Sequence, residues 1–371
     1  MPGIDGLDVA VFSFPTPTPE SDGTLDWDAT TAVVVTAHAG GRHGLGWTYS
    51  TGAAALVVSD HLEPAIVGRG ADDVAACWSA MHRACRNLGT RGLVMQAISA
   101  VDVALWDLKA RLLGVPVARL LGQCRDAVPV YGSGGFTSMS EDELGTQVDA
   151  WRRAGCSAMK IKIGEAWGSC EDRDLDRVAA LRRFAGPSVA LMVDANGGYQ
   201  LGQARRVGAR LDELDVVWFE EPVSSDDVAG LTALRADLRC DIAAGEYIAD
   251  LADARLLIGA VDCLQLDATR CGGYTGFLRA AALANAHQLN VSAHCAPALH
   301  LPVTAAIPNL AHVEWFADHA RLEPVLFDGV PEVRDGAMPV GLTGVGHGYQ
   351  LARPEAQKTN KLARSAGLDP R

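Results

Sequence analysis

Two lysines one residue apart give the first indication of chemistry in this chain. The stretch AMKIKIG at residues 158–164 is typical of a short buried strand. Because side chains alternate between the two faces of a strand, Lys160 and Lys162 point to the same side. Two neighbouring ammonium groups lower the pKa of each other, so one of them can act as a base near neutral pH. For the pair alone, an exposed edge strand, where lysine discourages aggregation, is the favoured interpretation.

Three carboxylates end three further apolar stretches. Asp194, Glu220 and Glu246 follow one another at intervals of 26 residues, the length of one strand and one helix with their connections. Brought together in a pocket of low dielectric constant, they repel one another unless a cation lies between them. Oxygen ligands without cysteine or histidine beside them favour Mg²⁺, and Asn196 is placed to add a hydrogen bond to such a site. Taken singly, each acid fits a helix N-cap or a solvated loop, but three in succession favour the metal site.

Three more ionisable residues, Asp267, His294 and Glu314, end the next three apolar stretches. A carboxylate beside a histidine fixes its tautomer and raises its basicity, so Asp267 and His294 are candidates for an acid/base dyad. Glu314 is expected to hydrogen-bond a substrate carboxylate if burial near other acids keeps it protonated. A base near a divalent cation suits removal of the proton α to a carboxylate, because the cation stabilises the enediolate that forms.

Such residues need a fold that brings many strand ends together. From residue 128 onward, helical stretches rich in Ala, Leu and Arg alternate with eight short apolar segments: VPVYGS, AMKIKI, VALMVDA, DVVWFEE, DIAAGE, DCLQLD, NVSAH and HVEWF. This alternation predicts βα units and a parallel sheet. A doubly wound sheet is the alternative, but no G-x-G-x-x-G follows the first segment. In a barrel, the carboxyl ends of all the strands meet at one mouth, where such folds keep their active sites. We therefore predict a modified (β/α)8 TIM-type barrel.

The first part of the chain has a different sequence pattern, which predicts an α+β domain that caps the barrel. Two β-rich runs flank Gly40 and Gly41, which is a hairpin signal. Residues 71–88 and 92–114 carry apolar residues at helical spacing, and Gly114 followed by Pro116 ends the second helix.

Composition excludes several classes of protein. At 371 residues, 49% hydrophobic and 21% charged, the chain is typical of a globular protein with more than one core. A formal charge of −13 argues against nucleic acid or an anionic membrane as partner. Nine cysteines without a CxxC pair indicate reduced thiols, and we see neither a signal peptide nor a membrane span, so we expect a cytoplasmic protein.

The motifs together resemble the enolase superfamily and, within it, the mandelate racemase subgroup. The stretch SAVDVALWDLKARLLGVPVARLLG at 99–122 is similar to the helix that joins the cap to the barrel in that superfamily. In the related muconate-lactonizing subgroup a lysine stands on a later strand, where this chain has Asp267 and His294 instead. The remaining motifs, in matching order and spacing, are KIK at 160–162, VDAN at 193–196, FEEP at 219–222, GE at 245–246, LDATRCGG at 266–273, SAH at 292–294 and VEW at 313–315.

The resemblance implies a division of the chain and roles for its residues. Residues 1–128 would form the capping domain, 129–320 the barrel, and 321–371 a segment that returns to the cap. The superfamily uses a Lys or His base with Mg²⁺, and its members usually assemble, so we expect a homo-oligomer. The resemblance implies Asp194, Glu220 and Glu246 for the metal, Lys162 and the His294–Asp267 dyad on opposite faces of the substrate, Lys160 as the neighbour that tunes Lys162, and Glu314 as electrophile.

Substrate specificity in such proteins comes from the cap. The stretch FSFPTPTPESDGTLDWD at residues 12–28 resembles a mobile lid loop over the barrel mouth, although a merely solvated loop fits nearly as well. Its polarity suits a hydroxylated substrate better than an aryl one. The residues predicted to contact the substrate, besides Asn196, are Glu20, Trp27, Tyr49 and Tyr131, and Cys295 and His300 are further candidates for the pocket lining.

Two reactions share the same first step. We rank first the dehydration of a polyhydroxy (sugar) acid to a 2-keto-3-deoxy acid, and second the racemisation or epimerisation of a 2-hydroxy or related carboxylic acid. A metal-dependent barrel hydrolase is less consistent with the sequence, since it would show histidine-rich metal ligation. A non-catalytic binding protein on this scaffold is also less consistent, because it would lack one or more of the strand-end residues.

Overall fold

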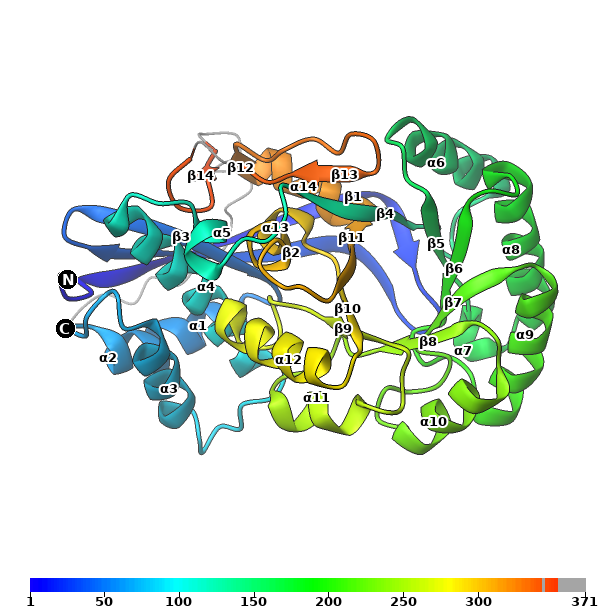
Figure 1. The fold of residues 1–371 in the computed structure, drawn as a ribbon, viewed down its shortest axis with the longest axis horizontal. Coiled ribbons are helices and arrows are strands. Elements are labelled where there is room, and N and C mark those ends of the chain that lie inside the picture. Colours follow the sequence, from blue (N-terminus) through cyan, green and yellow to red (C-terminus); the bar gives the residue numbers. More distant parts are fainter. Residues whose placement is uncertain (342–343, 353–371) are drawn as a thin grey trace.

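The computed structural model describes residues 1–341 and 344–352. It shows a β-rich N-terminal unit lying beside a barrel that is ringed by helices (Figure 1). Among the described residues, no helix combines the length and the apolar character needed to cross a bilayer. All nine cysteines lie in the described part and none forms a disulfide there.

The barrel consists of eight parallel strands, as predicted. Neighbouring strands pair in chain order, and the last strand pairs with the first, which closes the sheet. A short antiparallel strand, β13 (Ala337–Pro339), pairs with the N-terminal residues 127–129 of the first strand. The barrel strands are β4 (Ala127–Gly134), β5 (Ala158–Lys162), β6 (Ala190–Asp194), β7 (Val216–Glu220), β8 (Asp241–Ala244), β9 (Cys263–Leu266), β10 (Asn290–Ala293) and β11 (Leu310–Phe316).

Helices cover the outside of the barrel, which explains why its strands are apolar on both faces. The first of them begins at a capping box, in which Ser140 and Glu143 bond to each other's backbone. The helices are α6 (Glu141–Arg153), α7 (Glu165–Gly168), α8 (Glu171–Ala185), α9 (Leu201–Glu213), α10 (Val228–Asp237), α11 (Leu251–Leu257), α12 (Gly273–Ala286), α13 (Pro297–Thr304) and α14 (Ala317–Leu326).

The cap combines a three-stranded antiparallel sheet with helices. The hairpin predicted at Gly40 and Gly41 joins its second and third strands, and both glycines have positive φ. Helix α4 (Leu93–Leu113) packs so closely on the sheet that a Cβ atom at Gly44 or Gly46 would lie 2.2 Å from the backbone of the helix. Only glycine fits at these two positions. The cap elements are β1 (Gly6–Ser21), β2 (Asp26–Ala39), β3 (Arg42–Tyr49), α1 (Ala53–Val57), the π-helical turn η1 (Val58–Leu62), α2 (Glu63–Ile66), α3 (Val74–Ala84), α4 (Leu93–Leu113) and α5 (Val117–Leu121).

The predicted lid loop at residues 12–28 is wrong in one respect, because most of it is strand. β1 continues to Ser21 and β2 begins at Asp26, with a register shift between Pro15 and Glu20. The prolines that suggested a loop are tolerated because β1 is an edge strand of its sheet. The hairpin tip contacts the barrel, where Thr24 Oγ1 donates to the Asn196 carbonyl at 3.4 Å and Trp167 N donates to the Gly23 carbonyl at 2.9 Å.

The described part of the C-terminal segment runs back along the cap. β12 (Phe327–Asp328) pairs with β14 (Gln350–Leu351). His347 N donates to Asp107 Oδ1 at 2.8 Å, and Arg111 Nη2 donates to the Tyr349 carbonyl at 2.8 Å, so the segment is bonded to α4. The rest of the predicted returning segment, residues 342–343 and 353–371, lies outside the described residues. The division at residues 128 and 320 stays a prediction.

Candidate active site

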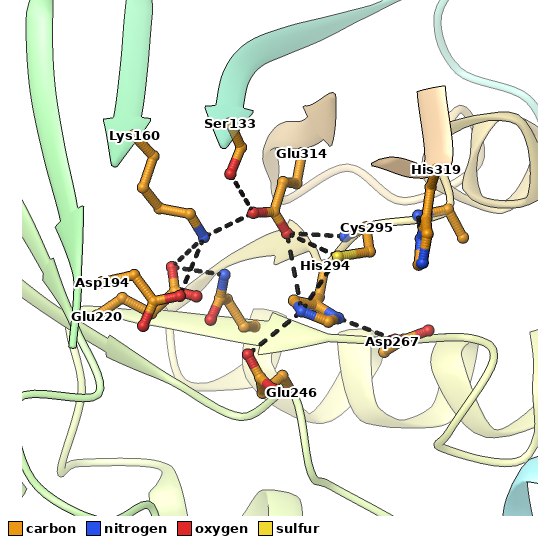
Figure 2. Close-up of polar contacts among 12 residues, drawn as sticks. Ser133, Lys160, Asp194, Glu220, Glu246, Asp267, His294, Cys295, Glu314 and His319 are labelled. Carbon is orange, nitrogen blue, oxygen red and sulfur yellow. Dashed lines mark hydrogen bonds and ion pairs between the residues drawn. The ribbon is translucent and has the colours of Figure 1, made fainter. Parts of the chain in front are cut away.

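The strand-end residues meet at one end of the barrel (Figure 2). Each is at most 5% exposed, so their charges interact in a largely dry environment. The two lysines lie on β5, and the other residues lie within two residues of the carboxyl ends of the next six strands, in order. These are Lys160, Lys162, Asp194, Glu220, Glu246, Asp267, His294 and Glu314.

Three of the carboxylates are grouped closely enough to hold one cation. Asp194, Glu220 and Glu246 each offer an oxygen within 4.8 Å of the oxygens from the other two. Glu220 Oε1 is buried and makes no hydrogen bond to the described residues, and Glu246 Oε2 is buried at 3.2 Å from His294 Nε2. Buried carboxylate oxygens of this kind carry a high free-energy cost unless a cation neutralises them. The donor set, all carboxylate, fits a hard cation such as Mg²⁺.

The two lysines occupy the space between these acids. Lys160 Nζ lies 2.6 Å from Glu220 Oε2 and 2.8 Å from Glu314 Oε1, and Lys162 Nζ contacts Asp194. Trp218 Nε1 and Gln265 Nε2 also donate to Glu220 Oε2, at 3.0 and 2.9 Å. Each ammonium group is therefore fixed by at least one carboxylate.

The predicted lowering of both lysine pKa values is wrong for this arrangement. Burial alone would lower the pKa of Lys160, but the charges of Glu220 and Glu314 outweigh it and hold the pKa well above its usual value. Burial also opposes the charge on Lys162, and Asp194 raises its pKa well above the usual value. The repulsion between the lysines is real but smaller than the attraction to Asp194, because the carboxylate is in direct contact.

His294 is held between two carboxylates on the other side of the mouth. Its Nδ1 lies 2.9 Å from Asp267 Oδ2, and its Nε2 lies 3.2 Å from Glu246 Oε2. Burial opposes a charged ring, but the neighbouring Cys295 and Glu246 and the bond to Asp267 hold the pKa of His294 well above its usual value. The backbone of Thr269 donates to Asp267 Oδ1 at 2.7 Å, which fixes that carboxylate in turn.

Glu314 is charged rather than protonated, which corrects the expectation from its acidic surroundings. Burial raises its pKa, but the ammonium group of Lys160 and the nearby His294 more than offset burial and lower the pKa below its usual value. The carboxylate accepts hydrogen bonds from Ser133 Oγ at 2.6 Å and from the backbone N–H of Cys295 at 2.8 Å. In this state Glu314 is a hydrogen-bond acceptor and not a donor.

Two lid residues reach the mouth through an aromatic cluster. Trp27 Nε1 donates to Glu20 Oε2 at 2.8 Å, and the Trp27 ring meets Phe136 edge-on at a centroid distance of 5.3 Å. Phe136 in turn packs against Phe316, and Lys162 Nζ lies 5.9 Å from the centre of the Phe316 ring. Burial and the charge of Asp318 raise the pKa of Glu20 to about 7.

The other residues predicted to contact the substrate, Tyr131, Tyr49 and Asn196, make contacts within the protein. Tyr131 is fully buried in the barrel interior, with its ring centre 5.2 Å from Lys160 Nζ, so it supports the lysine and does not line the mouth. Tyr49 stacks on His319 at a centroid distance of 3.5 Å. Asn196 hydrogen-bonds Asp194 Oδ1 at 2.9 Å through its backbone N–H and not through its side chain.

Three residues near the site were not predicted. Arg270 bridges the two sides, since its Nη1 lies 3.0 Å from Glu246 Oε1 and its Nε lies 3.4 Å from Asp267 Oδ2. Glu221 is 2% exposed at a φ of 37°. His319 accepts a hydrogen bond at Nδ1 from the Ala296 backbone at 3.1 Å. The motifs LDATRCGG and FEEP contain two of them, and HVEWFADHA places the third in the first turn of the helix that follows a strand.

Both the N-terminal and the C-terminal part of the chain match known protein families. Residues 8–122 match the N-terminal domain of the mandelate racemase / muconate lactonizing enzyme family. Residues 143–356 match the family described as enolase C-terminal domain-like. A mandelate racemase/muconate lactonizing enzyme-like protein from Rubrobacter xylanophilus has a crystal structure similar to this one, with a TM-score of 0.94 and 44% identity over 96% of this chain and 99% of that chain.

Two relatives with named activities cover most of the chain. L-talarate/galactarate dehydratase from Salmonella typhimurium LT2 is 34% identical over 339 residues, 89% of this chain and 82% of that enzyme. Its structure with Mg and L-lyxarohydroxamate has a TM-score of 0.88 and 31% identity over 97% of this chain and 93% of that chain. 3,6-anhydro-α-L-galactonate cycloisomerase from Streptomyces coelicolor is 32% identical over 335 residues, 87% of this chain and 91% of that enzyme.

Proposed function

Because this chain belongs to the mandelate racemase and muconate lactonizing enzyme family, we propose that it is a Mg²⁺-dependent dehydratase of acid sugars. The observation that carries the proposal is the buried group of three carboxylates with Lys162 on one side and the His294–Asp267 dyad on the other. The expected reaction removes the α-proton and the β-hydroxyl of a polyhydroxy acid and leaves a 2-keto-3-deoxy acid.

Asp194, Glu220 and Glu246 would hold the metal. When bound, Mg²⁺ supplies positive charge that stabilises the substrate carboxylate as the α-proton leaves. The unpartnered Oε1 of Glu220 supports this assignment, as does the Salmonella dehydratase structure that contains Mg.

Proton transfer falls to the residues on either side of the carboxylates. Lys162 must leave its ion pair with Asp194 and lose its proton to solvent before its amine can accept the α-proton. His294 is oriented by Asp267, so its Nε2 is the atom that exchanges a proton with the substrate. In dehydration one of these groups accepts the α-proton, and either can protonate the β-hydroxyl as it leaves as water.

Racemisation or epimerisation is the second candidate. It needs a proton-transferring group on each face of the α-carbon, and Lys162 with His294 supplies that pair. A β-hydroxyl on the substrate decides between the two outcomes, because its loss as water competes with reprotonation of the α-carbon. The cycloisomerase relative shows that chains of similar sequence also carry isomerase names.

The test is a library of mono- and diacid sugars incubated with the full-length protein and Mg²⁺ in D₂O. We expect keto-acid formation with at least one acid, and no product after chelation of the metal. Deuterium at the α-carbon without keto acid would replace the dehydratase by the racemase or epimerase. Absence of both, with Mg²⁺ binding confirmed by calorimetry, would indicate a non-catalytic binding protein.

We propose further that the acid-sugar substrate is the main partner and that the protein is a cytoplasmic homo-oligomer. Nine free cysteines support a reducing compartment. Sedimentation of the purified protein over a range of concentrations measures the oligomeric state, and a monomer at all concentrations contradicts that part.

A further inference from the structure

Cys295 introduces a thiol beside the proposed acid/base dyad (Figure 2). Its Sγ lies 3.2 Å from His294 Nε2 and 3.4 Å from Glu314 Oε2. The remaining pair, His294 Nε2 and Glu314 Oε2, is 3.9 Å apart. All three side chains are at most 5% exposed. One sulfur, one nitrogen and one oxygen therefore face a common point inside the barrel mouth.

The spacing of these three atoms is close to that of a tetrahedral metal site. With bonds of about 2.3 Å to sulfur and about 2.0 Å to nitrogen or oxygen, tetrahedral geometry places sulfur about 3.5 Å from the other donors. The same geometry separates nitrogen from oxygen by about 3.3 Å. The two sulfur distances match this spacing, and only the separation of His294 from Glu314 must shorten.

Glu246, which belongs to the carboxylate group proposed for Mg²⁺, lies next to His294 but is not one of these three donors. Its Oε2 is buried and lies 3.2 Å from His294 Nε2, where it forms an ion pair with the charged ring. Glu314 uses its Oε1 for Ser133 and Lys160, while its Oε2 accepts from the Cys295 backbone N–H at 2.8 Å and keeps a second lone pair for a cation.

The backbone fixes the thiol in this position. Cys295 has a φ of 52° and Ala296 a φ of 38°, values that non-glycine residues rarely adopt. His300 Nδ1 donates to the Cys295 carbonyl at 3.0 Å, while its Nε2 accepts from the Ala268 backbone at 2.7 Å. The Cys295 N–H donates to Glu314 Oε2. Strained backbone that its surroundings hold in place is typical of functional positions.

We propose that His294, Cys295 and Glu314 form a second metal site, distinct from the carboxylate group, that takes Zn²⁺ or another thiophilic divalent cation. Binding breaks the S–H bond of Cys295 and the N–H bond at His294 Nε2, and both protons are released to solvent. Thiolate and imidazole ligands select such ions over Mg²⁺, which prefers oxygen. A cation bound there occupies His294 Nε2, so it inhibits proton transfer by that residue. Binding of the cation does not depend on the proposed function of the protein. Inhibition of proton transfer by the cation rests on that function.

Co²⁺ is the spectroscopic probe for the site. The full-length protein in excess Mg²⁺ is titrated with Co²⁺ in a Cys124→Ser background, because Cys124 is the exposed cysteine. We expect a sulfur-to-cobalt charge-transfer absorption that saturates at one equivalent per chain. Cys295→Ser and Cys295→Ala should abolish this absorption. Its absence from the parent protein, or its persistence in both variants, overturns the proposal.

X-ray absorption of the zinc-loaded parent protein tests the site without any substitution of Cys295. A sulfur neighbour at about 2.3 Å from zinc is expected, and a shell of only nitrogen and oxygen contradicts the site. In the acid-sugar assay with excess Mg²⁺, Zn²⁺ should inhibit the parent, and Cys295→Ser should need about 100-fold more Zn²⁺ for half inhibition. Equal sensitivity of the two proteins overturns the inhibition part. If no acid sugar is turned over, the proposed function fails while the cobalt and zinc spectra still decide the site.

Discussion

The two sides of the barrel mouth hold their ionisable groups in different ways. On the side of β5 to β7, Lys160 and Lys162 are paired directly with carboxylates, at a distance of 2.6 Å for Lys160 and Glu220. On the side of β9 to β11, His294 is held by Asp267 from behind and faces carboxylates with its other nitrogen. The first side therefore holds ammonium groups between carboxylates. The second side holds a histidine between carboxylates.

This difference shows what must move before the site can work. The lysine side is neutralised internally, so a cation can reach Asp194 Oδ2 or Glu220 Oε2 only if the ammonium groups move away from these oxygens. The histidine side needs no such exchange, since Asp267 is fixed by the Thr269 backbone and fixes the ring in turn. We therefore expect the lysine side to rearrange on metal binding and the histidine side to be preorganised.

Neutralising Glu220 should have the largest effect. Glu220→Gln keeps the size of the side chain but removes a charge on which Lys160 and the proposed Mg²⁺ both depend. We expect loss of Mg²⁺ binding by calorimetry and a fall in kcat of about 10⁴-fold, since metal stabilisation of the transition state amounts to several kcal/mol. Glu213→Gln, an exposed acid at the end of α9, is the matched control. Unchanged Mg²⁺ affinity in Glu220→Gln would remove Glu220 from the metal site.

Removing the proton-transferring group from one side at a time tests whether the two sides face opposite faces of the substrate. Lys162→Ala and His294→Asn should each lower one stereochemical course of α-proton exchange by about 10³-fold, the usual contribution of general acid/base catalysis. The measurement is deuterium incorporation from D₂O into each of two α-epimers. If both variants keep full activity on the true substrate, the assigned roles are wrong.

Removing the charge of Asp267, which bonds to His294 Nδ1, should have a smaller effect. Asp267→Asn removes the negative charge next to Nδ1, so the pKa of His294 should fall from its raised value. The pH profile of kcat/KM should then show the histidine limb shifted to lower pH, and kcat should fall by about 10². An unshifted limb would mean that Glu246 and Cys295, and not Asp267, set the basicity of the ring.

The convergence of these residues could be predicted from the sequence, although their roles stay predictions. Apolar segments at βα spacing predict a barrel, and a barrel gathers whatever stands at the strand ends. The position along each strand is harder to predict. The sequence suggests Tyr131 at the mouth, but β4 continues to Gly134, so Ser133 and not Tyr131 reaches Glu314.

The charge states could not be predicted from spacing along the chain. Two lysines at positions i and i+2 predict mutual repulsion, yet the pKa of each depends more on the carboxylates that other strands bring within direct contact. The same applies to Glu314, whose neighbours in space include a lysine from β5 that is far away in sequence. The prediction of a loop at residues 12–28 failed for another reason, because proline and serine are common in loops and are also tolerated on the edge strand that β1 forms.

The smallest expected effect is a pH dependence of stability that arises in the lid. The folded protein raises the pKa of Glu20 from 4.5 to about 7, so the stability contributed by its neutral form is full below pH 4.5 and is lost as the pH rises through 7. Glu20→Gln stays neutral and can still accept the Trp27 hydrogen bond, so between pH 4.5 and 7 it should lose less stability than the parent. We expect a difference of about 1 kcal/mol or less, since solvent screens a carboxyl near the surface. Thermal unfolding of both proteins across this pH range, with Glu213→Gln as control, measures it, and parallel curves for Glu20→Gln and the parent would show that the lid carboxyl is already charged at low pH.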